Sequence, residues 1–194
     1  MLASRTYLAV GQPEKAEQLL QSAIKEDPRK PETYSLLGQL YTRLNRIDEA
    51  TKTYSDMVAR DEKSVAGHTM LGILYEQEGK LADAEKEYQR AFDLDPHAAV
   101  AANNLAMIHI NRNAKLDVAQ QLAESALREM PNDPNVNDTV GWVHYKRQEY
   151  SAALQYLQKS GAARQQPANG ASYPPGEFGN ALRQLAQLVK ADVG

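Results

Sequence analysis

Apolar and small residues recur along most of this chain at the three- and four-residue spacing of amphipathic helices. Leu71 and Tyr75 fall on one face of a short predicted helix, and Tyr88 and Ala91 fall on one face of the next. Gly79 interrupts the pattern between them, because glycine readily adopts the left-handed conformation that ends a helix. The basic unit is therefore two short helices joined by a tight turn.

The same turn signal returns at a fixed distance along the sequence. Gly11, Asn45, Gly79 and Asn113 are each separated by 34 residues. A constant period of this size indicates stacked copies of one unit rather than a domain with one central core. The pattern predicts no strand, and helices over 14–27, 32–44, 48–61, 66–78, 82–94, 99–111, 116–129, 134–147, 151–160 and 177–190.

The segment 65–98 resembles the tetratricopeptide repeat (TPR), a 34-residue helix–turn–helix. The residues that match the family pattern at positions 4, 7, 8, 11, 20, 24, 27 and 32 are His68, Leu71, Gly72, Tyr75, Ala84, Tyr88, Ala91 and Pro96. The small residues of this set allow two helices to approach closely, and the aromatic ones fill wider gaps. The resemblance implies an all-α fold, a right-handed superhelical solenoid of TPR units.

The pattern divides residues 1–166 into five units and leaves a sixth half-unit. The units span 1–30, 31–64, 65–98, 99–133 and 134–166, and the first lacks the beginning of its first helix. Met57 replaces a small residue in the second repeat, and the fourth repeat carries one extra residue in its turn. Ser64 and Asp133 are expected to cap the helices that follow them.

The end of the chain departs from the repeat. Residues 167–176 are rich in proline and glycine and predict a loop, and residues 177–194 predict a C-terminal capping helix with one apolar face. That helix is expected to pack on the fifth unit and close the stack. Exchange of the same helix with a neighbouring molecule is the alternative.

Composition excludes several classes of partner and chemistry. The chain has 22 lysines and arginines against 25 acids and no cysteine, so it offers neither a basic surface for nucleic acid nor a disulfide or cysteine-ligated metal. It has no apolar run long enough for direct membrane insertion. Residues 138–157 resemble the last repeat of bacterial exopolysaccharide-export and exosortase-associated TPR proteins. The sequence does not distinguish the bacterial cytoplasm from the periplasm as the compartment of the protein.

The sequence shows no motif for catalysis or for binding a cofactor or a metal. Three of its four histidines, His68, His109 and His144, occupy packing positions of the repeat, and His97 falls in a loop. No metal-binding spacing, phosphate-binding glycine loop or nucleophile motif is present. We therefore expect a protein that is not an enzyme.

The resemblance implies that the first helix of each unit lines a concave groove. The groove positions predict partner contacts at Leu36, Gln39, Arg43, Met70, Ile73, Gln77, Asn103, Asn104, Met107, Asn111, Asp138, Trp142, Tyr145 and Lys146. Exposed apolar residues rimmed by polar ones favour protein binding, and Trp142 and Met107 are the expected anchors. Alternatively, Trp142 packs beneath residues 161–176 or beneath the last helix.

The most direct functional prediction is a scaffold that binds a helix or an extended peptide of another protein in this groove. The alternative is a self-assembling repeat protein that forms homo-oligomers through open repeat ends or through exchange of the C-terminal helix.

Overall fold

The computed structural model describes residues 11–163 and Gln187. Residues 11–163 form nine helices and no strand. The helices are α2 (Pro13–Glu26), α3 (Pro31–Arg43), α4 (Ile47–Arg60), α5 (Val65–Gln77), α6 (Leu81–Leu94), α7 (Ala99–Asn111), α8 (Leu116–Glu129), α9 (Pro134–Lys146) and α10 (Tyr150–Ala163). Each begins within one residue of its predicted start, which confirms the helical pattern; the predicted loop 167–176 and helix 177–190 lie outside the described residues, Gln187 aside.

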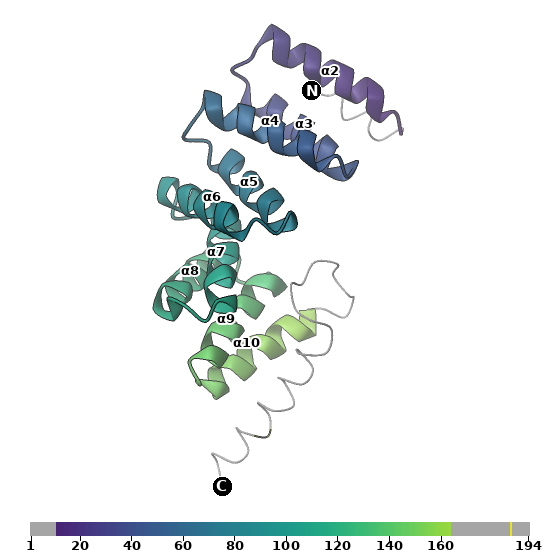
Figure 1. Ribbon diagram of the computed structural model, residues 1–194. Helices are drawn as coiled ribbons and strands as arrows, with labels where there is room; N and C mark the ends of the chain where they lie inside the picture. The colour runs from purple at the N-terminus through teal and green to yellow at the C-terminus, as the bar shows by residue number, and fades with distance from the viewer. Residues whose placement is uncertain (1–10, 164–186, 188–194) are drawn as a thin grey trace. The chain divides into compact units, whose positions relative to one another are not determined.

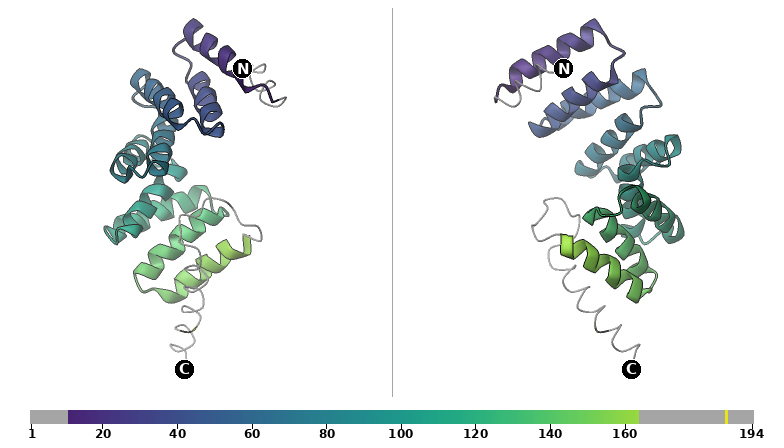
Figure 2. Two further views of the ribbon diagram at one scale, coloured as in Figure 1. Left: turned by 45° about the vertical axis from the view of Figure 1, so that its right-hand side comes forward. Right: turned by 180° about the vertical axis from the view of Figure 1, so that it is seen from behind.

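The helices pack as consecutive pairs within two compact units. The first unit covers residues 1–95 and contains α2 to α6, and the second covers residues 96–194 and contains α7 to α10. In the first unit α3 lies against α4 and α5 against α6; in the second, α7 lies against α8 and α9 against α10 (Figures 1 and 2). This is the helix–turn–helix arrangement that the repeat predicts.

The turns between paired helices share one backbone device. Gly11, Asn45, Gly79 and Asn113 all adopt a positive φ, between 50° and 74°, as the 34-residue period predicts. In the α7–α8 turn Lys115 adopts a φ of 50° as well, so the inserted residue is accommodated by a second left-handed position.

Local capping explains where several helices begin. The Ser64 hydroxyl accepts a hydrogen bond from Gly67 N (3.2 Å) at the start of α5. The Asp133 carboxylate accepts bonds from the first turn of α9, at 2.8 Å from Asn135 N and 3.1 Å from Val136 N. Both caps confirm the sequence prediction, and each satisfies backbone donors that a helix start leaves free.

Glycines allow the two helices of a pair to touch. A Cβ atom added at Gly72 would lie 2.5 Å from the ring of Tyr88, which is fully buried. Gly141 is equally restricted, because its added Cβ would lie 2.7 Å from the Leu157 side chain. A small residue on one helix and a large one on the other therefore set the spacing of these pairs.

A charged network joins α2 to the α3–α4 turn in the first unit. The Glu17 carboxylate accepts hydrogen bonds from the Tyr41 hydroxyl (2.9 Å) and from Arg46 (2.7 Å). Arg46 also lies over the Tyr41 ring, 4.5 Å from its centroid. The bond from Arg46 lowers the pKa of Glu17, and burial raises the pKa of Tyr41.

Across residues 11–163, every helix is too short or too polar to cross a lipid bilayer.

Candidate functional site

The first-helix face of the first unit is the exposed side of α3 and α5. Among the residues predicted there, Leu36, Met70 and Ile73 are half-buried, whereas Gln39, Arg43 and Gln77 are exposed. Leu36 and Met70 also pack against the apolar core of the unit. Apolar groups with one side on the core and the other toward solvent, beside polar neighbours, form a surface suited to a partner.

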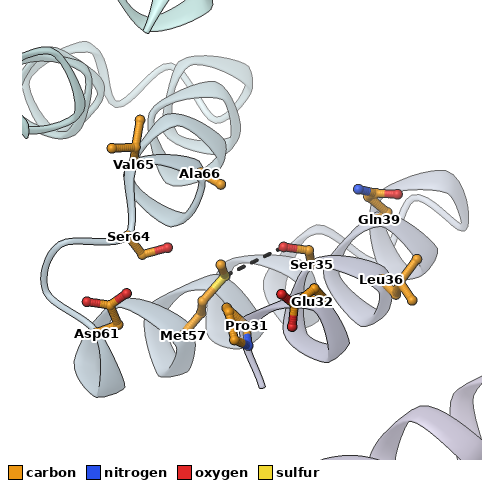
Figure 3. Close-up of a pocket in the computed structure, with 10 residues that line it drawn as sticks. All are labelled: Pro31, Glu32, Ser35, Leu36, Gln39, Met57, Asp61, Ser64, Val65 and Ala66. Carbon is orange, nitrogen blue, oxygen red and sulfur yellow. Dashed lines mark hydrogen bonds between the residues drawn. The ribbon is translucent and has the colours of Figure 1, made fainter. Parts of the chain in front are cut away.

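A cavity of about 620 Å³ lies between α3 and the start of α5 (Figure 3). We call it the α3–α5 pocket; the residues that line it are Pro31, Glu32, Ser35, Leu36, Gln39, Met57, Asp61, Ser64, Val65 and Ala66. Its volume falls within the range of about 300–1,000 Å³ that ligand sites typically have. In Figure 3, Ser64, Val65 and Ala66 stand on one side of the space and Leu36 and Gln39 on the other.

The charged residues of the pocket lining come from helix ends. Glu32 lies in the first turn of α3, where the positive end of the helix dipole favours a carboxylate. Asp61 is the C-terminal cap residue of α4, and its Oδ1 accepts a hydrogen bond from Lys63 N at 3.0 Å. The start of α3 and the end of α4 therefore each contribute one carboxylate.

Met57 separates the pocket from the core. Its side chain is only 4% exposed, and its sulfur accepts a weak hydrogen bond from the Ser35 hydroxyl at 3.8 Å. The equivalent positions of the next two 34-residue repeats hold Ala91 and Ala126, both fully buried. The departure from the repeat that the sequence shows at Met57 thus coincides with the pocket.

The first-helix face of the second unit is more closed. Asn104, Met107 and Tyr145 are half-buried, and Asn111 and Lys146 are exposed. The remaining predicted contacts are buried instead of open: Asp138 is 1% exposed, Trp142 7% and Asn103 8%.

Two contacts lie on this face of the second unit. Helix α7 packs directly against α9, and the Trp142 ring meets the Tyr145 ring edge-on with centroids 5.3 Å apart. The Trp142 indole is buried rather than exposed, and its role as a partner anchor stays a prediction. The alternative packing partners, residues 164–176 and the last helix, lie outside the described residues.

Several pocket residues were not among the predicted contacts. Met57, Asp61 and Ser64 belong to the second helix or to the turn between units, which the groove positions of the repeat do not include. Glu32 and Ser35 occupy groove positions, so the repeat numbering could have found them. The substitution at Met57 was the available signal for the rest.

Three of the four histidines, His68, His97 and His144, lie beside carboxylates. The two ring nitrogens of His68 lie 2.6 Å from a Glu87 carboxylate oxygen and 3.1 Å from the Glu62 carbonyl oxygen. His144 lies 2.6 Å from Glu149, and this bond, with a smaller effect of Arg147, lowers the pKa of Glu149. Among the described residues no group of three possible metal ligands gathers at one place.

Comparison with protein families gives the repeat its name. One tetratricopeptide repeat model matches residues 7–74, and a second matches residues 65–98. Residues 7–98 are therefore tetratricopeptide repeats. The fold is accordingly an all-α solenoid of TPR units.

Solved TPR structures show the same fold. PilF of Pseudomonas aeruginosa is 20% identical, with a TM-score of 0.76, and the match covers 97% of this chain and 82% of PilF. MamA is 20% identical, with a TM-score of 0.68, over 83% of this chain and 94% of MamA. YrrB, described as a TPR protein with an unusual peptide-binding site, is 18% identical, with a TM-score of 0.65, and the match covers 93% of this chain and 87% of YrrB. A comparison with curated protein sequences found no match.

Proposed function

We propose that this TPR protein is a non-enzymatic scaffold that binds a helix or an extended segment of another protein on its first-helix faces. The observation that carries the proposal is the α3–α5 pocket, which adjoins the half-buried apolar residue Leu36. TPR proteins are generally protein-interaction scaffolds, and the solved structure of YrrB is described as having a peptide-binding site.

The proposed contacts are those predicted residues that reach solvent. In the first unit they are Leu36, Gln39, Arg43, Met70, Ile73 and Gln77. In the second unit they are Asn104, Met107, Asn111, Tyr145 and Lys146. Apolar side chains at the centre of such a surface supply most of the binding free energy, and the polar ones around them set orientation.

Selection from a displayed library of random dodecapeptides, followed by amide chemical-shift mapping with the selected peptides, tests this function. The shifts should concentrate on α3 and α5. Leu36→Ala and Ile73→Ala should each weaken binding several-fold. Leu81→Ala is the matched control, because Leu81 is an exposed leucine on the second helix of its unit. Shifts confined to α4 and α6 would contradict the proposal.

Self-assembly is the second candidate function. The open repeat ends and the C-terminal helix that would mediate it lie outside the described residues, so it stays a prediction. Size-exclusion chromatography over a concentration series distinguishes the two functions, because a scaffold for another protein elutes at one volume whereas a self-assembling chain elutes earlier as concentration rises.

A further inference from the structure

The α3–α5 pocket combines apolar walls with charge of a single sign. Both charged residues of its lining, Glu32 and Asp61, are acids. The walls include Leu36, Met57 and Val65, and Ser35, Ser64 and Gln39 add hydrogen-bonding groups. This is the environment that suits the side chain of arginine or lysine, which has an apolar stem and a cationic end.

Two neighbouring cations have contacts with other residues. Lys30, which precedes α3, pairs with Asp27 at 3.5 Å, and the guanidinium of Arg60 lies over the Tyr34 ring, 5.6 Å from its centroid. Lys63 shares the turn with Asp61 but is not part of the lining. The bond to Asp61 Oδ1 comes from the backbone N–H of Lys63 and not from a side-chain cation.

The second unit shows that a TPR pair does not require these acids. The residue equivalent to Glu32, second in α7, is Val100, and the residue equivalent to Asp61, the C-terminal cap of α8, is Met130. There the two first helices, α7 and α9, pack directly on each other. An aspartate also follows α2 (Asp27) and α6 (Asp95), so the acid at Asp61 recurs in the repeat, and it is the combination of Glu32 with Asp61 that is particular to the α3–α5 pocket.

We infer that the α3–α5 pocket binds an arginine or lysine side chain of an extended partner segment. The inference rests on the proposed function and specifies its ligand. Glu32, from the first turn of α3, and Asp61, from the C-terminal end of α4, hold the cationic group, and Leu36 and Val65 contact the aliphatic stem. A peptide whose C-terminal carboxylate or acidic side chain approached this pocket would be repelled.

The test uses the full chain and peptides selected from the dodecapeptide library. Selected peptides that shift the amides of Ser35, Ser64 and Ala66 should share an arginine or lysine. Replacing that residue by neutral citrulline or glutamine should raise the Kd about tenfold, the typical effect of losing a charge-assisted hydrogen bond. The Kd should also rise with salt concentration, because the pair is partly exposed.

A matched pair of double variants identifies the acids responsible. Glu32→Gln with Asp61→Asn should remove the difference between the basic peptide and its neutral analogue. Glu14→Gln with Asp48→Asn removes the same charge from two exposed first-turn acids of α2 and α4 and should leave the difference intact.

The contrary results separate the two proposals. Peptides that shift the pocket amides but contain no basic residue, or that bind equally well after neutralisation, overturn this inference and leave the scaffold function standing. Equal losses in both double variants also overturn it, because they show only a general effect of net charge. If none of the selected peptides shifts the amides of α3 or α5, both proposals are overturned.

Discussion

The two units contain the same kind of helix pair, but the first helices of successive pairs pack differently in each. In the second unit α7 lies directly on α9, and the groove positions Asp138 and Trp142 are buried. In the first unit a cavity separates α3 from the start of α5, and the equivalent groove residues remain accessible. A repeat pattern therefore fixes how the two helices of one repeat pair. It does not fix how closely the first helices of successive repeats pack.

One position helps to explain the contrast. At the place where a second helix meets the two first helices, the first unit has Met57 and the second has Ala126. Alanine allows close approach of a neighbouring helix, whereas a buried methionine occupies more volume and keeps its neighbours apart. The five predictions below test this comparison, from the largest expected effect to the smallest.

Trp142→Ala should cost the most stability. A buried Trp→Ala substitution typically lowers the free energy of unfolding by about 3–5 kcal/mol. Ile73→Ala, at the same groove position of the first unit, should cost far less, because Ile73 is only half-buried. Urea denaturation of both variants measures the two losses, and equal losses would remove the contrast between open and closed faces.

Met57→Ala gives the first unit the residue that the second unit has. Because the Met57 side chain is 4% exposed, its removal should lower the free energy of unfolding by about 2–4 kcal/mol. The same urea titration applies, with Met70→Ala as the half-buried methionine control. A gain in stability would show instead that Met57 only holds α5 away from α3.

Gly72→Leu tests the feature that both units share, the close contact within a helix pair. A side chain here must displace the Tyr88 ring, so the loss should be about 1–3 kcal/mol. Gln77→Leu, at an exposed position of the same helix, should change the melting temperature little. Thermal unfolding followed by circular dichroism compares the two.

Lys115→Gly addresses the one-residue insertion that only the second unit contains. Lys115 adopts a φ of 50°, which is strained for a residue with a side chain and costs about 1 kcal/mol. Glycine removes this strain, but it also gives the unfolded chain more conformational freedom, which lowers stability. The free energy of unfolding should therefore rise by less than about 1 kcal/mol. A lower melting temperature in this variant would contradict the strain.

Glu17→Gln should show the smallest effect, and a pH-dependent one. The pKa of Glu17 is lowered in the folded state by its bond from Arg46, so the stabilisation is present above the unfolded pKa, about 4.3, and disappears as pH falls through the folded pKa. For a partly exposed pair it should stay below about 1 kcal/mol. The difference in melting temperature from the parent chain should therefore shrink between pH 7 and pH 3; a constant difference would exclude the ionic contribution.

The sequence by itself determined the helices and their turns. Helix bounds follow from apolar periodicity, and positive-φ turns at Asn45, Gly79 and Asn113 follow from residues that tolerate that conformation. The caps at Ser64 and Asp133 are equally local. Each of these features depends on residues within a few positions of one another, so a single repeat contains all the information.

The tertiary structure alone decided which groove positions are open. Glu32 and Asp61 come from different helices and meet at one pocket only because of how α3, α4 and α5 pack. Trp142 has the same place in the pattern as Ile73, yet it is buried, in a unit where α7 packs directly on α9 and the Trp142 ring meets the Tyr145 ring. Spacing between successive first helices is set by side-chain volumes from several segments at once, and a periodic pattern in one segment does not carry that information.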